Sequence, residues 1–325
     1  MKSAVLTAPQ TIQLEERPLP TPGPGERLVR VGYVGICGTD LALFSSQERD
    51  QAKPFVPGHE LSGRLVDGNT GEPGSWVALA PLLNCRSCAE CQSGQENLCA
   101  SRRLFGVGSD GGLQEYITAP QDRLVPLPEG ISPVEGALVE PTAVAVHACR
   151  VAGCAPGEKA LVLGAGAIGM LIAQVWRASG GEVLGIVDQD ESRLIAAERE
   201  GFKAISVLPA LPGKPAVLFE ATGSARAFAA WLPHLDTHGR AVVVGKLVEP
   251  VEINWVSLLR KEGSIRTSRF FTMDDFYTAV DLIQNGLVNL ENLIGGVVTL
   301  MEFQEEHGRK IMLKAQVVIR LVVEV

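Results

Sequence analysis

The sequence predicts an α/β protein that combines a parallel-sheet domain with a second, mostly β-stranded domain. A glycine-rich turn at 164–169 joins an apolar strand-like run to a helical pattern. After Pro141 such runs alternate with helical patterns, which favours right-handed βαβ units. Before Pro141 the chain is rich in glycine, proline and short alternating runs instead. The length of 325 residues is sufficient for about two domains.

The second half supplies the elements of the parallel sheet. Short apolar runs predict buried strands, and helical periodicity with terminal glycines predicts the helices between them. We expect strands at 160–163, 183–187, 216–219 and 241–244, and helices at about 168–178, 192–200, 225–232 and 274–284.

The first part predicts short antiparallel strands joined by turns, in a barrel-like unit. The alternating runs lie at 26–37, 59–67, 74–80 and 112–118. The tail from about Leu287 is again strand-like.

Composition and hydropathy argue against nucleic acid and a membrane as partners, and the cysteine content indicates the cytoplasm. The net charge is −8 and no block of Lys and Arg occurs, which argues against nucleic acid. The apolar stretch 160–176 is shorter than the ~20 residues that span a membrane, and glycines interrupt it. Seven cysteines without a signal peptide are typical of a reducing cytoplasm, where metal binding is more common than disulfides.

Four cysteines lie in one short segment, 84–100, with the spacing C-x2-C-x2-C-x7-C. They are Cys85, Cys88, Cys91 and Cys99. Such spacing lets four thiolates converge on one tetrahedral ion, which predicts a structural zinc site. Because four thiolates close the coordination sphere, we expect this ion to organise the segment and to take no part in catalysis.

The glycine-rich turn predicts a dinucleotide site. Gly164, Gly166 and Gly169 form G-x-G-x-x-G between a strand and a helix, the context that pyrophosphate binding requires. Asp188 ends the next strand, where its carboxylate suits a ribose hydroxyl and repels a 2′-phosphate. We therefore expect NAD. Arg193 lies nearby and would tolerate a phosphate, so NADP stays open as an alternative.

A second set of metal-binding residue types is spread over three distant segments. Cys37 lies in GICGTD, His59 and Glu60 lie in PGHE, and Glu140 lies in VEPTAVAVH. A cysteine, a histidine and a carboxylate suit a catalytic zinc that keeps one open position. Taken singly, a buried thiol and surface polarity explain these residues. Together with the dinucleotide motif and the four cysteines, they favour the metal.

These motifs together resemble the zinc-dependent medium-chain dehydrogenase/reductase family, in particular its sorbitol and polyol branch. The resemblance covers nearly the whole chain. Its landmarks, in order, are GICGTD (35–40), PGHELSG (57–63), the four cysteines, DGGLQEY (110–116), VEPTAVAVHA (139–148), GAGAIG (164–169) and FEATG (219–223).

The resemblance implies a fold of two domains. A GroES-like β-barrel catalytic domain would comprise 1–141 and 287–325, and a Rossmann NAD-binding domain would comprise 142–286. The active site would lie in the cleft between them.

The resemblance also implies roles for individual residues. Cys37 and His59 would bind a catalytic zinc, with Glu60 as a ligand or switchable near-ligand. Glu140 matches the position where the polyol branch carries a glutamate. Thr39 would contact the substrate hydroxyl and pass on its proton. With the structural ion, two zinc ions per subunit are expected.

On the cofactor side, the resemblance adds contacts beyond the motif itself. The residues expected to bind NAD are Gly164, Gly166, Ile168, Gly169, Asp188, Arg193 and Thr222.

The chain departs from the family at Ala42, where many relatives have a histidine that relays the proton to solvent. Here the relay would use water, the nicotinamide ribose or another group. The family also implies a homo-oligomer, either a dimer or a tetramer.

Hydride transfer between NAD and a polyol, sugar alcohol or other secondary alcohol is the function that these observations favour. One alternative is a dehydrogenase of an amino-alcohol such as threonine or an aminocyclitol. Another is a zinc-free reductase of quinones or enones, against which the metal-binding residues argue. The last is an NAD-sensing protein that retains the fold without activity.

Overall fold

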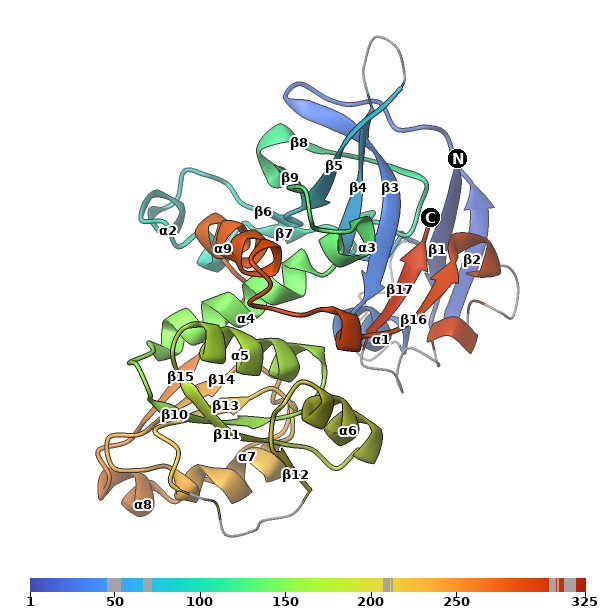
Figure 1. Cartoon of the computed structure of the whole chain (residues 1–325). Coiled ribbons are helices and arrows are strands. Elements are labelled where there is room, and N and C mark those ends of the chain that lie inside the picture. The colour runs from blue at the N-terminus through green and yellow to red at the C-terminus, as the bar shows by residue number, and fades with distance from the viewer. Residues whose placement is uncertain are drawn as a thin grey trace. The chain divides into compact units, whose positions relative to one another are not determined.

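A computed structural model describes residues 1–45, 54–66, 72–206, 211, 213–303, 308, 310–312 and 320–325. The chain divides into two compact units, Met1–Glu140 with Ile294–Val325, and Pro141–Leu293 (Figure 1).

The second boundary between the units falls after Leu293, whereas the sequence places it after Gly286. Gln174, in the helix α5 (Ala167–Ala178), accounts for the difference. Its side-chain amide donates to the Asn289 carbonyl oxygen (2.9 Å) and accepts from the Asn289 N–H (2.6 Å). This paired contact attaches the segment after Gly286 to the second unit.

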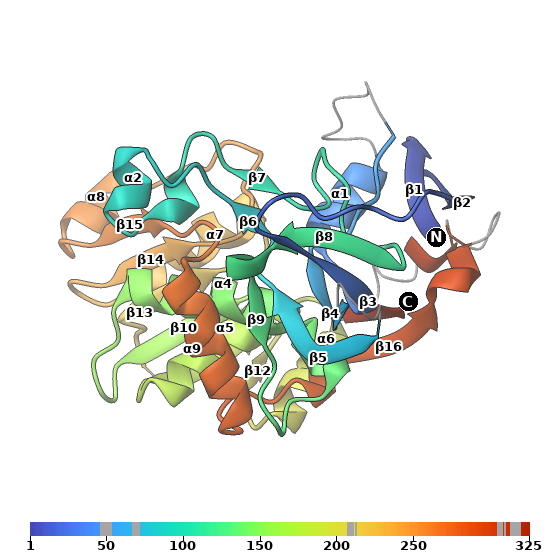
Figure 2. The ribbon, with the colours of Figure 1, turned by 90° about the horizontal axis from the view of Figure 1, so that it is seen from above.

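The first unit is built on a mostly antiparallel sheet with the strand order β16-β17-β3-β4-β5-β9, in which β8 also pairs with β3. Figure 2 shows β3, β4 and β5 side by side. The strands are β3 (Glu26–Ile36), β4 (Glu60–Val66), β5 (Pro73–Leu79), β8 (Tyr116–Pro120), β9 (Leu124–Pro126), β16 (Ile294–Thr299) and β17 (Arg320–Glu324).

Smaller elements complete the first unit. They are the hairpin of β1 (Lys2–Ala8) and β2 (Thr11–Glu16), the pair β6 (Leu82–Leu83) and β7 (Arg103–Leu104), and the short helices α1 (Gly38–Phe44), α2 (Ala89–Gln92) and α3 (Pro133–Gly136). The helix α4 (Val139–Ala152) begins here and continues into the second unit.

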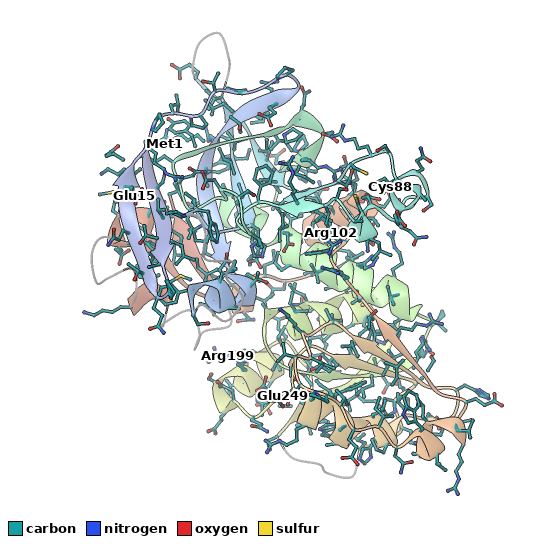
Figure 3. All side chains as sticks on the ribbon, turned by 180° about the vertical axis from the view of Figure 1, so that it is seen from behind. Met1, Glu15, Cys88, Arg102, Arg199 and Glu249 are labelled. Carbon is teal, nitrogen blue, oxygen red and sulfur yellow. The ribbon has the colours of Figure 1, made fainter. Side chains whose placement is uncertain are left out.

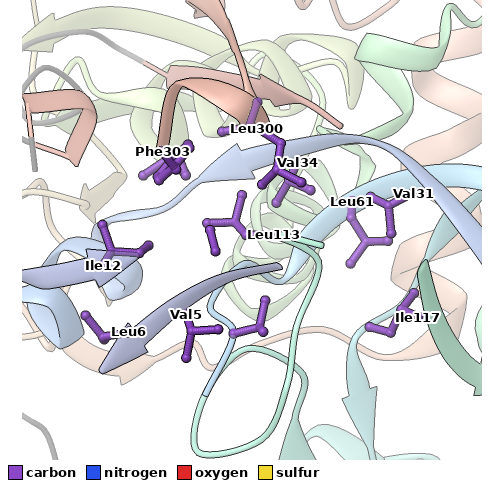
Figure 4. Close-up of a cluster of buried hydrophobic side chains, with 14 of the residues drawn as sticks. Val5, Leu6, Ile12, Val31, Val34, Leu61, Leu113, Ile117, Leu300 and Phe303 are labelled. Carbon is purple, nitrogen blue, oxygen red and sulfur yellow. The ribbon is translucent and has the colours of Figure 1, made fainter. Parts of the chain in front are cut away.

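The core of the first unit is made by segments far apart in sequence. Val34 of β3, Leu61 of β4 and Phe303 of the tail are buried in one apolar cluster (Figure 4). The tail is therefore part of this core, which explains why the first unit contains both ends of the described chain.

The second unit holds a six-stranded sheet, parallel throughout, with the order β12-β11-β10-β13-β14-β15. Its strands are β10 (Lys159–Leu163), β11 (Glu182–Val187), β12 (Ala204–Ile205), β13 (Val217–Glu220), β14 (Arg240–Val243) and β15 (Ser264–Thr267). Its helices besides α4 and α5 are α6 (Glu191–Arg199), α7 (Ala225–Trp231), α8 (Trp255–Leu259) and α9 (Met273–Gln284).

Helices cover both faces of this parallel sheet. Figure 1 shows α5 over one face and α7 and α8 over the other. The strand order reverses between β10 and β13, the kind of switch point at which α/β folds bind ligands.

The expected strands and helices of the second unit are confirmed to within one residue at each end. The apolar stretch 160–176 forms β10, the glycine turn and most of α5. Within the described ranges, no helix combines the length and apolar character needed to cross a membrane.

Candidate functional site

The first candidate site brings together Cys37, His59 and Glu60, whose ligand atoms all lie within 4.8 Å of one another. Cys37 follows β3, and Glu60 begins β4 directly after His59. Because β3 and β4 pair antiparallel, the end of one strand lies beside the start of the other. The side chains of His59 and Glu60 are buried.

Asp40 connects the two segments that carry these residues. Its fully buried carboxylate accepts hydrogen bonds from the N–H groups of Cys37 (2.8 Å) and Gly58 (3.1 Å). Its Oδ1 also lies 3.6 Å from Nδ1 of His59. A carboxylate behind a histidine orients the ring in many metal sites. Nothing in the sequence pattern assigns Asp40 this role, although it lies in the GICGTD motif.

Glycines provide the space that the site needs. Gly35 faces Glu60 across β3 and β4, and a Cβ there would lie 2.3 Å from Glu60 Oε2. Gly58 has a φ of +96°, the left-handed region that glycine tolerates best. A Cβ on Gly111 would lie 2.2 Å from the Gly58 carbonyl oxygen. Larger residues would displace either Glu60 or the segment that carries His59.

The charges of the site suit a divalent cation. Burial lowers the pKa of His59, but the neighbouring Asp40 carboxylate and Cys37 thiolate outweigh burial and raise that pKa well above its usual value. The Asp40 and Glu60 carboxylates are fully buried and Cys37 is half-buried, and negative charges in such a setting need a compensating positive charge. Thiolate, imidazole and carboxylate with one open position are the donor set of a catalytic zinc. The residues therefore fit the zinc that the motifs imply.

Glu140 and Thr39 are the two other residues expected at this site. The group that meets within 4.8 Å contains Glu60 and does not include Glu140, which is buried in the first turn of α4. The geometry thus favours Glu60 as the carboxylate ligand, and ligation by Glu140 stays a prediction. Thr39 is half-buried in α1, directly after Gly38.

The four cysteines form a second group whose sulfur atoms all lie within 4.8 Å of one another. Figure 3 labels Cys88 in this loop-rich lobe, just before α2. The Sγ atoms of Cys85 and Cys91 are 4.0 Å apart, close to the ~3.8 Å of two thiolates on one tetrahedral zinc. All four are free thiols, so the lobe has no disulfide.

Local hydrogen bonds act differently on the cysteines of the lobe. The N–H and hydroxyl of Ser87 and the N–H of Cys88 lower the pKa of Cys85 to about 6, which favours the thiolate that binds metals. The Cys91 N–H lowers the pKa of Cys88, but the neighbouring Glu90 carboxylate outweighs it and raises that pKa to about 12, and burial raises the pKa of Cys91. The Cys85 N–H points in turn to Cys99 Sγ at 3.5 Å. The lobe therefore fits the structural zinc expected from its spacing.

The second unit contains a cavity of about 540 Å³ at the carboxyl ends of β10, β11 and β13. Its wall includes five of the residues expected to bind the cofactor, namely Gly164, Gly166, Asp188, Arg193 and Thr222. It also includes Ser224 and Arg226, which no sequence motif marks.

The glycine turn closes one side of this cavity. Gly164 has a φ of +104° and Gly166 is the N-cap of α5. A Cβ on Gly169 would lie 1.8 Å from the Gly164 carbonyl oxygen, so only glycine permits this packing. Gly169 and the neighbouring Ile168 are not among the residues that line the cavity, and their contact with the cofactor stays a prediction.

Asp188 fixes the glycine turn against the end of β11. Its Oδ2 accepts the Ala165 N–H (2.7 Å), and its Oδ1 accepts the N–H groups of Gln189 (2.7 Å) and Asp190 (2.9 Å). The carboxylate is thereby held on the cavity wall, where it can accept from a ribose hydroxyl.

Comparisons with known proteins agree with both units. The family "Alcohol dehydrogenase GroES-like domain" matches residues 23–129, and the family "Zinc-binding dehydrogenase" matches residues 167–285. A probable D-xylulose reductase A of Aspergillus clavatus is 33% identical, over 93% of this chain and 90% of the relative.

Two solved structures share the fold over the whole chain and carry different cofactors. An alcohol dehydrogenase from E. coli complexed with NADH has a TM-score of 0.90 and 26% identity, and covers 100% of this chain and 99% of that one. A zinc-binding dehydrogenase from Sinorhizobium meliloti bound to NADP has a TM-score of 0.87 and 26% identity, with the same coverage of 100% and 99%.

Proposed function

The chain belongs to the zinc-dependent medium-chain dehydrogenase family, and on that premise we propose that it transfers hydride between NAD and a polyol, sugar alcohol or other secondary alcohol. One observation carries the proposal. The same chain holds a group of Cys37, His59 and Glu60, whose ligand atoms converge, and a cavity built on a G-x-G-x-x-G turn. A metal at the first can activate the hydroxyl, and a dinucleotide in the second can accept the hydride, which together supply the chemistry of this reaction.

The chain's own residues would bind and orient the reactants. Cys37, His59 and Glu60 would hold a zinc ion. That ion, when bound, would lower the pKa of the substrate hydroxyl and polarise the ketone in the reverse direction. Thr39 would accept the hydroxyl proton through its side-chain oxygen. Since Ala42 cannot transfer a proton, the proton would leave Thr39 through water or the cofactor ribose.

We propose NAD as the preferred cofactor. Asp188 lies on the cavity wall, and its negative charge would repel a 2′-phosphate. Arg193 and Arg226 lie on the same wall, and their positive charges would attract a 2′-phosphate. The hydrogen bonds that fix Asp188 favour NAD, because they hold the carboxylate in place at the ribose end of β11.

Replacing Asp188 by alanine is expected to weaken NAD binding about tenfold, the equivalent of one hydrogen bond to a charged group. NADP binding should weaken less or improve, because a repulsive charge is lost. Titration of the protein with NAD and with NADP measures both. Glu191→Ala, which removes an exposed carboxylate nearby that is not on the cavity wall, is the matched control. An unchanged NAD to NADP ratio in Asp188→Ala would place the selectivity elsewhere.

A panel of candidate alcohols and ketones, assayed by the formation or consumption of NADH, tests the substrate class. The relative named a D-xylulose reductase acts on a ketose, whose reduction at the ketone gives a polyol. We expect NADH to form with xylitol or sorbitol, and D-xylulose to be reduced with NADH. Activity with L-threonine alone would support the amino-alcohol alternative. No NADH formation with any alcohol, despite measured NAD and zinc binding, would support the NAD-sensing alternative.

Two broader expectations belong to this proposal. All seven cysteines are free thiols, which suits a reducing compartment such as the cytoplasm. We also expect a homo-oligomer, and light scattering coupled to size exclusion measures it.

A further inference from the structure

His59 follows a short loop, 56–58, and the backbone of this loop is bound to the segment 111–113. All three carbonyl oxygens of the loop accept N–H groups of that segment. The pairs are Val56 with Gly111 (2.7 Å), Pro57 with Leu113 (3.0 Å) and Gly58 with Gly112 (2.8 Å). The position of His59 therefore depends on what fixes this loop.

The two N–H groups of the loop are each bound by a carboxylate, since the proline between them has no N–H. Asp40 accepts the Gly58 N–H (3.1 Å), and Oδ1 of Asp110 accepts the Val56 N–H (2.9 Å). Hydrogen bonds to a charged acceptor are about twice as strong as neutral ones. Asp40 also lies beside the His59 ring, whereas Asp110 acts at the other end of the loop.

Asp110 is itself held by well-anchored parts of the first unit. Its Oδ2 accepts a hydrogen bond from Arg17 Nη1 (2.9 Å), and Arg17 directly follows β2. The Arg17 backbone is paired with Met1, by one hydrogen bond in each direction (2.7 and 2.8 Å). Leu113, three residues after Asp110, is fully buried in the core of the unit (Figure 4). The carboxylate is thus a fixed point against which the loop is held.

Close backbone packing leaves the loop little freedom at its Gly58 end. A Cβ on Gly106, whose φ is +72°, would lie 2.6 Å from the Gly58 carbonyl oxygen. At the other end, Val56 is fully buried. Loss of the Asp110 carboxylate would leave the N–H of this buried residue without its acceptor, which costs free energy unless the loop moves.

We propose that Asp110 is a positioning residue for His59 in the metal site of the first unit. It holds the loop 56–58 through the Val56 N–H, and its ion pair with Arg17 is secondary. The side chains of that pair are 47% and 27% exposed, and exposed pairs contribute little. The inference rests on the proposed function, because it requires a metal ion at this site.

The test measures zinc affinity by competition with a coloured chelator. In Asp110→Ala the dissociation constant of the zinc at Cys37 and His59 should rise about tenfold, as when an outer partner of a metal ligand is lost. The zinc of the four-cysteine lobe should be held as before. Cys37→Ala, which is expected to keep only the lobe's zinc, identifies the two ions.

Two further variants separate the hydrogen bond from the ion pair. Asp110→Asn keeps an oxygen that can accept the Val56 N–H, so it should restore wild-type zinc affinity. Arg17→Ala is the matched control, because it removes the ion pair and leaves the carboxylate; it should also bind zinc like the wild type. With cobalt in place of zinc, the visible spectrum should change in Asp110→Ala and stay unchanged in the other two, which a loss of stability alone would not produce.

A folded Asp110→Ala that holds both zinc ions like the wild type, or that loses both equally, would overturn the inference, as would Arg17→Ala with the affinity of Asp110→Ala. If Asp110→Ala does not fold, Asp110→Glu and Asp110→Asn decide. The glutamate keeps the charge but displaces the acceptor, so it should hold zinc less tightly than the asparagine; equal affinity would overturn the inference. A wild-type protein that binds zinc only in the four-cysteine lobe would instead refute the proposed function itself.

Discussion

Cys37→Ala is expected to reduce turnover by about a thousandfold or more, because the metal supplies several kcal/mol of stabilisation to the reacting oxygen. Cys37 provides the only thiolate of its group, and its N–H is held by Asp40. Without this thiolate, His59 and Glu60 leave too few ligands for a catalytic zinc. NAD binding should be unchanged, because the cofactor cavity is built by the other unit.

The measurement is NADH formation from the best alcohol of the panel, together with an NAD titration. Cys154→Ala is the matched control. Cys154 is a half-buried thiol that belongs neither to the four-cysteine group nor to the group of Cys37, His59 and Glu60. It should retain wild-type turnover. Ordinary turnover in Cys37→Ala would show that the Cys37, His59 and Glu60 group is not the catalytic centre.

Cys99→Ala is expected to lower the stability of the protein more than its activity. Cys99 is the fully buried member of the four-cysteine group, in a lobe whose only regular elements are short. Loss of one ligand would release the ion that organises the lobe, at a cost of about 3 kcal/mol in the free energy of unfolding. For a unit of this size that corresponds to a fall of about 10 °C in the melting temperature.

Cys149→Ala separates loss of the metal from loss of a buried sulfur. Cys149 is buried in α4 and belongs to neither cysteine group. Its replacement should cost about 1 kcal/mol, the ordinary value for a core substitution. Thermal unfolding of both variants, with zinc content measured alongside, tests the difference. Equal melting temperatures with unchanged zinc content would contradict a structural metal in the lobe.

Most elements of the parallel-sheet unit could be predicted from the sequence, because its inner strands are continuous apolar runs. β10 is buried at every position after Lys159, as a strand covered on both faces requires. β12 and β15 carry no such signal, since β12 has two residues and β15 is largely exposed. Both lie at the edges of the sheet, where burial does not dictate the residue type.

Only part of the candidate site could be predicted from the sequence. Cys37, His59 and Glu60 belong to residue types that chemistry singles out. The supporting contacts depend on strand register, which places Gly35 opposite Glu60, and on a loop fold that brings Asp40 to Gly58.

Zinc content per chain tests the central claim most directly. Wild-type protein purified without chelators should contain two zinc ions per chain, and Cys37→Ala should contain one. One zinc or none in the wild type, or two in Cys37→Ala, would contradict the assignment of one structural and one catalytic metal.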